Sequence, residues 1–363
     1  MTDRVTVNID LDALTHNFHV VKKNTQAKII AMVKGNGYGH GLVRVAHTLC
    51  NADAFGVSDI AEAIQLRLAD IRQTIVVIGG FLSAADLLEF SIQRLDSVVH
   101  TEQQIEQLEI TTLPTPINIW LKINTGMNRL GFAPAEVDRI YHRLTRCPSV
   151  ARIYMMSHLS DADTVNSKKT TIQIDCFKEI TSKYSSCEKS LAKSGGILGW
   201  PTSHFDWVRP GIMLYGISPL SNTSANQYHL KPVMTVRSQL VAIQYCHADD
   251  KVGYNGIWEC QEDMPIGVVA MGYADGYPRH AKNGTPILID DKICPLVGRV
   301  SMDFITVDLR SHPRAKIGDI VTLWGKGLPA EEVARHADTI AYELTTRISP
   351  RIITTSEKNE KIH

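Results

Sequence analysis

From residue 28 to residue 212, short apolar runs alternate with longer amphipathic stretches. Eight of the apolar runs have the length of a strand, and the stretches after most of them have helical spacing. The strand candidates cover residues 28–33, 54–57, 74–78, 97–100, 117–123, 150–157, 190–193 and 207–212. This alternation is typical of a parallel sheet with right-handed crossovers, and eight units predict a (β/α)8 barrel of the TIM type. Functional side chains are then expected at the carboxyl ends of the strands.

The pattern changes near Lys231, beyond which the chain is rich in strands. Strands are predicted at residues 233–243, 265–271, 286–289, 304–309 and 319–323, and a helix at 330–337. The run 5–9 also alternates like a strand, and Asp10 or Asp12 would cap a helix over 13–23. We therefore expect an α/β chain with a barrel domain at residues 10–228. A mostly β C-terminal domain at 229–363 would come next, with residues 1–9 adding a strand to it.

Composition narrows the classes of function. The formal net charge is zero, so neither a nucleic acid nor an anionic membrane is an expected partner. No run of about eighteen apolar residues predicts a membrane span, and residues 1–5 have no signal-peptide core. The seven cysteines are scattered without a Cys-x-x-Cys pair, which favours reduced thiols and a cytoplasmic location. The 14 histidines show no pair with metal-ligand spacing, so no metal is expected.

Residues 31–41 read Ala-Met-Val-Lys-Gly-Asn-Gly-Tyr-Gly-His-Gly. Lys34 directly follows the first barrel strand, where partial burial favours its neutral amine. Neutral lysine amines attack carbonyls, and pyridoxal phosphate (PLP) is a carbonyl cofactor that proteins hold in this way. A single lysine at a strand end is more often a surface residue, so this interpretation depends on the residues at the ends of the other strands.

Polar side chains stand at the ends of four later strand candidates as well. The fifth strand leads to Lys122 and Arg129, the sixth to His158, the seventh to Ser194, and the eighth contains Arg209. Because the carboxyl ends of all barrel strands meet at one rim, these groups are predicted to form one functional site there.

These blocks resemble the alanine racemase family in order and spacing from Val5 to Arg351. The resemblance implies that Lys34 binds PLP covalently and acts as one catalytic base, while Tyr254 acts as the other. A phenol with a pKa of about 10 needs cationic neighbours to act as a base, and His158 and Arg209 are the candidates. The resemblance further implies that PLP is bound by Lys34, Tyr38, His158, Ser194, Arg209, Gly211, Ile212 and Tyr342.

Arg209 matches an arginine that donates to the pyridine nitrogen. A guanidinium stays protonated, so it leaves this nitrogen neutral and makes the ring a weaker electron sink. Lys122 matches a lysine that is often carbamylated in the family and then pairs with the arginine at the position of Arg129. By the same resemblance, the substrate is bound by Arg129, Tyr273, Met302 and Asp303.

The chain departs from the family pattern in several places. Glycines 35 and 37 stand where alanine is common, and Asn128 and Asn255 stand where glycine is common. Lys193-Ser-Gly-Gly replaces Asn-Ser-Ala, and Ser301 often has a cysteine counterpart. No catalytic position is lost.

The resemblance implies an alanine racemase that interconverts L-alanine and D-alanine with two bases on opposite faces of the cofactor. The product would supply bacterial peptidoglycan from the cytoplasm. Tyr254 and Met302 fall in a different predicted domain from Lys34, and in the family these positions reach across from the partner subunit. The resemblance therefore implies a head-to-tail homodimer with shared sites. One alternative is a racemase of the same fold for serine, lysine or arginine. Less favoured are a PLP decarboxylase, a non-catalytic PLP-binding protein and a metal enzyme.

Overall fold

The computed structural model describes residues 4–357. Residues 1–3 and 358–363, which the predicted domain ranges include, lie outside the described residues. The chain divides into two compact units, one made of residues 17–214 and 219–223 and the other of the remaining described residues. Between residues 4 and 357, no helix combines the length and apolar character needed to cross a bilayer.

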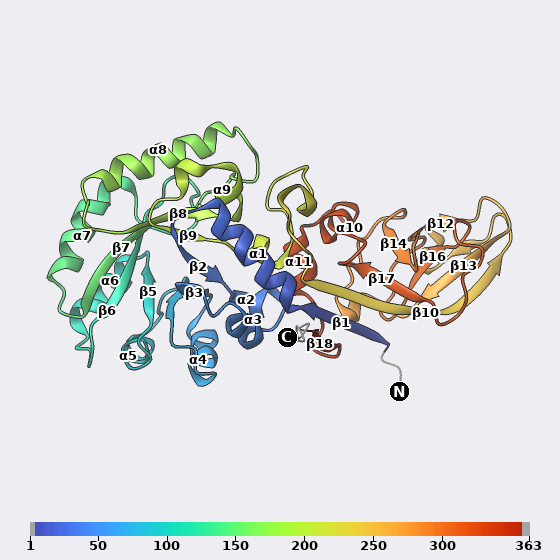
Figure 1. Cartoon of the computed structure of the whole chain (residues 1–363), viewed down its shortest axis with the longest axis horizontal. Coiled ribbons are helices and arrows are strands. Elements are labelled where there is room, and N and C mark those ends of the chain that lie inside the picture. The colour runs from blue at the N-terminus through green and yellow to red at the C-terminus, as the bar shows by residue number, and fades with distance from the viewer. Residues whose placement is uncertain (1–3, 358–363) are drawn as a thin grey trace, which may run out of the picture. The chain divides into compact units, whose positions relative to one another are not determined.

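The first unit is a closed barrel of eight parallel strands, which confirms the predicted fold (Figure 1). Neighbouring strands succeed one another in the chain, and the last strand closes the barrel by pairing Trp207 with Lys28. Strands covered on both faces read as continuous apolar runs, and Ala54–Val57 is buried along its whole length. The strands are β2 (Lys28–Met32), β3 (Ala54–Val57), β4 (Thr74–Val77), β5 (Asp96–Val99), β6 (Ile117–Lys122), β7 (Val150–Met156), β8 (Lys189–Lys193) and β9 (Trp207–Arg209).

Helices connect these strands on the outside of the barrel (Figure 1). Several begin at a polar cap, since Asp59, Ser83 and Thr101 each accept a hydrogen bond from the backbone N–H three residues later. Asp10, one of the two predicted caps, accepts from the Ala13 N–H at 2.8 Å and starts α1. The helices are α1 (Leu11–Asn24), α2 (Lys34–Tyr38), α3 (Leu42–Thr48), α4 (Ile60–Leu68), α5 (Ala84–Ile92), α6 (Glu102–Ile110), α7 (Val137–Arg146), α8 (Lys168–Ser182) and α9 (Ser194–Gly199).

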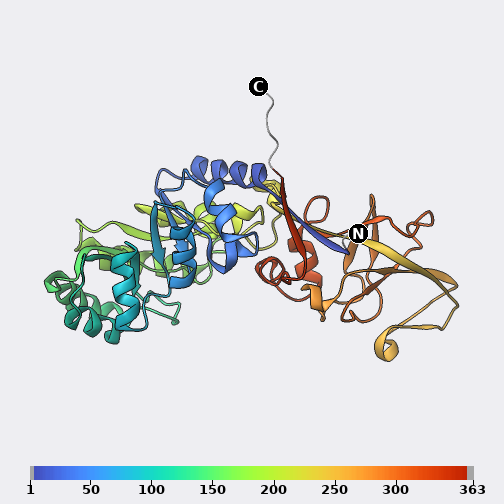
Figure 2. The same ribbon diagram turned by 90° about the horizontal axis from the view of Figure 1, so that it is seen from below.

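The second unit is built on an eight-stranded sheet. Its longest strand, β10 (Met234–Cys246), pairs with β1 (Val5–Asp10), β13 (Met264–Val269) and β17 (Ile320–Trp324). The remaining strands are β14 (Pro286–Ile289), β15 (Lys292–Pro295), β16 (Ile305–Asp308) and β18 (Ile353–Glu357). Strand β1 lies between β10 and β18, so both ends of the described chain meet in this sheet (Figure 2). Two helices, α10 (Ala330–His336) and α11 (Ala341–Thr346), complete the unit.

Three features of this unit are absent from the sequence prediction. Strand β15 pairs with β14 across a short turn, and the exposed strand β18 pairs in parallel with β1. The third is a hairpin of two-residue strands, β11 (Lys251–Val252) and β12 (Trp258–Glu259). These strands are too short, or too polar, to produce an apolar alternation in the sequence.

Candidate active site

Lys34 begins a turn of left-handed backbone at the end of β2. Residues 35–39 all have positive φ, with values of 63°, 54°, 63°, 53° and 83°. Three of the five are glycine, which avoids the cost of about 1–2 kcal/mol per residue that other residues incur there. Asn36 fixes the turn, because its Oδ1 accepts from the Leu42 N–H and its own N–H donates to Glu62, both at 2.9 Å. The glycines at 35 and 37 therefore suit the backbone on which Lys34 lies.

The Lys34 amine is shifted toward its neutral form. Burial is the largest cause of its lowered pKa, and the nearby charges of Arg129 and Arg209 lower the pKa further. Glu62 acts in the opposite direction. An amine of this kind is prepared for nucleophilic attack on a carbonyl and for proton abstraction.

Arg209 ends β9 and is buried. Its guanidinium donates to the Ser190 Oγ at 2.6 Å and to the carbonyl oxygens of Ser157 and Leu191 at 2.5 and 3.2 Å. It also lies 3.3 Å from the Nδ1 atom of His158. Burial lowers the pKa of Arg209 to about 10, so the group remains protonated near neutral pH. The barrel strands thus hold a fixed cationic donor at the rim.

His158 is neutral in this surrounding. Burial holds the pKa of the imidazole well below its usual value, and the charges of Arg209 and Lys193 act in the same direction. This lowered pKa argues against His158, and in favour of Arg209, as the group that supplies positive charge to Tyr254.

Ser194, Tyr38 and Gly211 lie together at the ends of neighbouring strands. The Ser194 Oγ accepts from the Gly211 N–H at 2.8 Å, and an added Cβ on Gly211 would lie 2.4 Å from the Tyr38 Oη. Burial raises the pKa of Tyr38 to about 12, so its hydroxyl keeps its proton and can donate. Ile212 comes directly after Gly211 and is fully buried. Two hydroxyls and a side-chain-free backbone form a set suited to a phosphate group.

The rim carries more cations than its own carboxylates balance. Lys122 is buried, and its pKa is lowered to about 8 by burial and by the charges of Arg209, Arg129 and Lys34. Such mutual depression of pKa values shows that several cationic groups lie close to one another at the rim. An anionic cofactor with a phosphate, together with a carboxylate substrate, fits this surplus of charge. The residues therefore fit PLP.

Tyr254 lies in the second unit, at the tip of the β11–β12 hairpin. Its side chain is 67% exposed. The neighbouring Gly253, Asn255 and Gly256 have φ values of 74°, 62° and 52°. Asparagine is one of the few residues that tolerate this conformation, which explains how Asn255 replaces a glycine. The hairpin packs on the segment that precedes Met302, since a Cβ on Gly253 would lie 3.4 Å from the Arg299 nitrogen.

Tyr273 and Met302 lie on two interlocked turns. The Tyr273 N–H donates to the Ser301 carbonyl, and the Ala274 N–H donates to the Met302 carbonyl, both at 3.0 Å. The backbone at Gly272 approaches so closely that an added Cβ would lie 2.2 Å from the Met302 carbonyl oxygen. Tyr273 and Met302 are both partly exposed, so the second unit brings these two predicted substrate residues to one surface.

Asp303 is bound by two arginines. Its Oδ1 accepts from Arg4 at 3.2 Å and from Arg351 at 2.9 Å, and these arginines lower the pKa of its carboxyl. The same arginines pair with Asp275, at 3.4 and 2.7 Å, and Asp275 also accepts from the Gly272 N–H at 2.9 Å. This ring of ion pairs explains Asp303 as a group that holds its turn in place. Tyr342 lies in α11 and is half-buried, and Arg347 at the end of that helix approaches Gly276.

Several residues that hold the site were absent from the sequence prediction. Ser190 and Ser157 orient Arg209, and Arg4, Asp275 and Arg351 hold the turn of Asp303. Ser157 carried a signal, because it precedes His158 directly at a strand end. The others are separated from their partners by long stretches of chain.

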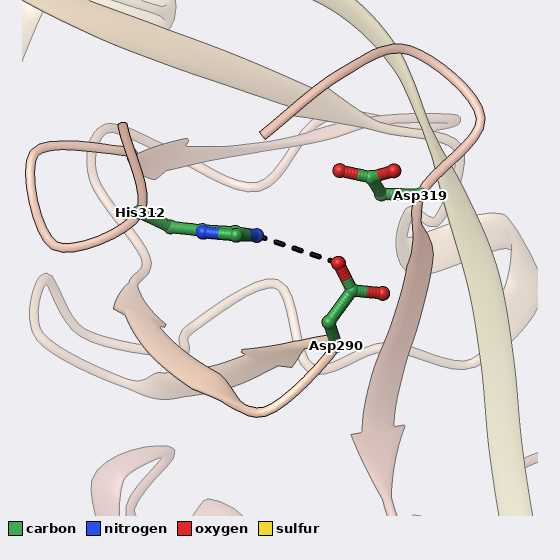
Figure 3. Close-up of side chains that lie close together, drawn as sticks. All are labelled: Asp290, His312 and Asp319. Carbon is green, nitrogen blue, oxygen red and sulfur yellow. Dashed lines mark hydrogen bonds and ion pairs between the residues drawn. The ribbon is translucent and has the colours of Figure 1, made fainter. Parts of the chain in front are cut away.

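A separate group of Asp290, His312 and Asp319 lies in the turns beside β14 and β17 (Figure 3). One potential ligand atom from each residue lies within 4.8 Å of the others. The His312 Nε2 lies 3.4 Å from Asp290, and the Asp319 carboxylate accepts from the Lys316 N–H at 2.8 Å. The first contact joins two turns and the second closes a third, and we assign the group a structural role.

Comparison with known proteins gives one family over nearly the whole chain. The model of the alanine racemase N-terminal domain matches residues 9–219, and that of the C-terminal domain matches residues 233–355. A protein named alanine racemase from Coxiella burnetii (strain RSA 331) is 46% identical over 357 residues, covering 96% of this chain and 98% of that protein. One from Aeromonas hydrophila is 48% identical over 346 residues, covering 95% of this chain and 97% of that protein.

Solved structures agree with the sequence relatives. The crystal structure of biosynthetic alanine racemase from Pseudomonas aeruginosa superimposes with a TM-score of 0.96 at 38% identity, covering 98% of this chain and 100% of that one. The structure of alanine racemase from Acinetobacter baumannii gives 0.92 at 35% identity, with coverages of 98% and 100%.

Proposed function

This chain belongs to the alanine racemase family, and from that premise we propose that it interconverts L-alanine and D-alanine with PLP as its cofactor. The observation that carries the proposal is the combination of groups at one barrel rim. Lys34 has a lowered pKa, and the buried Arg209 stays protonated within reach of the neutral His158. Relatives named alanine racemase favour alanine over the larger amino acids of the alternative.

We propose that Lys34 and Tyr254 are the two bases. Racemisation requires that the α-proton leave one face and that a proton return on the other, so one base must be deprotonated while the other holds a proton. The Nζ of Lys34 receives or returns the proton on one face, and the Oη of Tyr254 does so on the other. The lowered pKa of Lys34 supports its half of this exchange.

The remaining rim residues hold the cofactor and the substrate. When bound, PLP supplies delocalisation of the negative charge that proton removal leaves on the α-carbon. Arg209 would donate to the ring nitrogen without transferring its proton, and Ser194, Tyr38, Tyr342 and the backbone at Gly211 and Ile212 would bind the phosphate. These roles agree with the burial and hydrogen bonds of the Arg209 and Ser194 groups.

Arg129, Tyr273 and Met302 complete the proposed substrate site, and Asp303 holds the turn on which Met302 lies. Arg129 binds the substrate carboxylate, and Tyr273 narrows the entrance. We further propose that Lys122 is carbamylated. Its pKa of about 8 leaves a fraction of neutral amine that can react with carbon dioxide, and the new carboxylate would offset the charge of Arg129.

We propose that the active form is a head-to-tail homodimer. Tyr254 is 67% exposed and Met302 is 54% exposed, whereas a base and a substrate contact work best out of bulk water. A second copy would cover these side chains and would bring Tyr254 to the partner's Lys34. Residues 10–228 would then form the PLP-binding domain, and residues 229–363 with 1–9 the domain that supplies Tyr254. The product would serve peptidoglycan synthesis in the cytoplasm.

Deuterium exchange tests the proposal directly. The protein with PLP is given L-alanine or D-alanine in D2O, and α-deuteration and optical rotation are monitored together. Lys34→Ala should abolish the visible absorbance of the lysine-bound cofactor and all racemisation. Tyr254→Phe should slow proton abstraction from L-alanine more than from D-alanine.

The chain offers a matched control for each variant. Lys28 begins the strand that leads to Lys34 and pairs with Glu188, so Lys28→Ala should keep the absorbance and the turnover. Tyr245 is exposed on β10, and Tyr245→Phe should behave as the unaltered protein. Equal slowing of both directions by Tyr254→Phe would contradict the assignment of the two faces.

A further inference from the structure

Cys246 and Cys260 lie together although 13 residues separate them in the sequence. Cys246 packs on the apolar cluster that contains Cys260, Val252 and Val297, and its thiol is near enough to contribute to the raised pKa of Cys260. Two backbone hydrogen bonds of 2.8 Å join Cys260 to residues 249 and 250. The two cysteines therefore stand at the base of one closed segment.

That segment is the hairpin with Tyr254 at its tip. Cys246 ends β10, and Cys260 comes directly after β12. Between them, β11 and β12 pair through Val252 opposite Trp258. A bond between the two sulfurs would therefore connect the two ends of the hairpin that presents Tyr254.

The two thiols differ in access. Cys260 is 1% exposed, and burial is the main cause of the raised pKa of its thiol. Cys246 is partly exposed. An oxidant from solution therefore meets the sulfur of Cys246 first, and Cys260 is placed to react with it afterwards.

We propose that Cys246 and Cys260 form a reversible disulfide that disables the Tyr254 hairpin when the protein meets hydrogen peroxide. The Cys246 thiolate attacks one peroxide oxygen, which breaks the O–O bond, gives a sulfenic acid and releases one water after protonation. The Cys260 sulfur then attacks the sulfenic sulfur, and a second water leaves. Two thiols are oxidised to one disulfide, and one peroxide is reduced to two waters. Cytosolic disulfides of this kind are usually transient and serve redox sensing.

Bond formation must move the hairpin. Non-bonded heavy atoms rest about 3.5–4.0 Å apart, whereas a disulfide holds its sulfurs about 2.0 Å apart. Bond formation therefore draws together the two ends of a hairpin whose Val252 lies two residues from Tyr254. Misplacement of a catalytic group by about 1 Å can lower turnover about a hundred-fold.

The disulfide itself is independent of the proposed function, and only its effect on turnover rests on Tyr254 as a base. The PLP-loaded protein is treated with hydrogen peroxide and then alkylated, and peptides are mapped by mass spectrometry without reduction. We expect a Cys246–Cys260 crosslinked peptide, a fall in racemisation of at least about ten-fold, and recovery of both on adding a reductant. Cys246→Ser and Cys260→Ser should each lose the crosslink and retain turnover under peroxide.

Cys50→Ser is the matched control, because Cys50 is the exposed cysteine of the barrel unit and its loss should leave the response unchanged. Free alkylation of both thiols after peroxide would overturn the proposal, as would a crosslink without loss of turnover. The proposal would also be overturned if peroxide lowered the turnover of Cys246→Ser as much as that of the unaltered protein. A protein that never racemises alanine would contradict the proposed function, while the peptide map would still report on the disulfide.

Discussion

Gly211→Ala is the sharpest test of the phosphate-binding region. The added Cβ would lie 2.4 Å from the Tyr38 Oη and 3.0 Å from the adjoining ring carbon, whereas ordinary contact begins at 3.4 Å. The hydroxyl must therefore move by about 1 Å. Tyr38 is buried and stands at the end of a left-handed turn, so it has little room to turn away.

Overpacking of this size destabilises a folded chain by about 1–3 kcal/mol. A displacement of about 1 Å at a binding group should also lower turnover about a hundred-fold, and the affinity for PLP should fall. Urea unfolding of the PLP-free protein gives the first quantity, and titration with PLP monitored by absorbance gives the second. The two measurements separate a general loss of stability from a local loss of binding.

Gly199→Ala is the matched control. Gly199 ends α9 in the same unit, and its added Cβ would make only ordinary contacts, at 3.5 and 3.8 Å from Leu220. A double variant of Gly211→Ala with Tyr38→Phe removes the oxygen at 2.4 Å, so part of the lost unfolding free energy should return. Should Gly211→Ala unfold and bind PLP as Gly199→Ala does, the close approach of Tyr38 to Gly211 is refuted.

Three further perturbations test the hydrogen bonds and charges. Burial raises the pKa of Asp96 from 3.8 to about 6, so its folded form holds a proton that the unfolded form releases. The unfolding free energy should thus fall by about 2 kcal/mol from pH 4 to pH 6, and Asp96→Asn should remove that fall in urea titrations. Ser190→Ala removes the 2.6 Å acceptor of Arg209 and should lower kcat about ten-fold with little change in KM. Arg351→Gln frees Asp303 from one cation and should raise KM for alanine while the cofactor absorbance stays.

The barrel was predictable because most residues of its strands are buried on both faces. Residues 54–57 and 75–77 contain only apolar residues and glycine, and the structure buries all of them. The rim groups were predictable from the same pattern, since Lys34, Lys122 and Arg209 stand at strand ends in the sequence itself. The positions of these residues relative to the strands were therefore sufficient to predict this part of the site.

The second unit was less predictable because its pairing is not local. Strand β18 reads Ile-Thr-Thr-Ser-Glu and is largely exposed, and its partner β1 lies more than 340 residues away, with Thr6 opposite Ile353. Nothing in the sequence of either strand indicates that it pairs with the other. The ion pairs that hold Asp303 are also non-local, because Arg4 and Asp303 are separated by 299 residues.

The roles of Asp303 and His158 show what a residue pattern leaves out. Both residues stand where the family resemblance implies a functional group, but their charges depend on neighbours that only the fold supplies. Two arginines keep Asp303 ionised and hold it in ion pairs. Burial beside Arg209 keeps His158 neutral. A carboxylate already paired with two cations holds a turn in place better than it binds a substrate. A neutral imidazole likewise accepts a hydrogen bond where an imidazolium would repel Arg209.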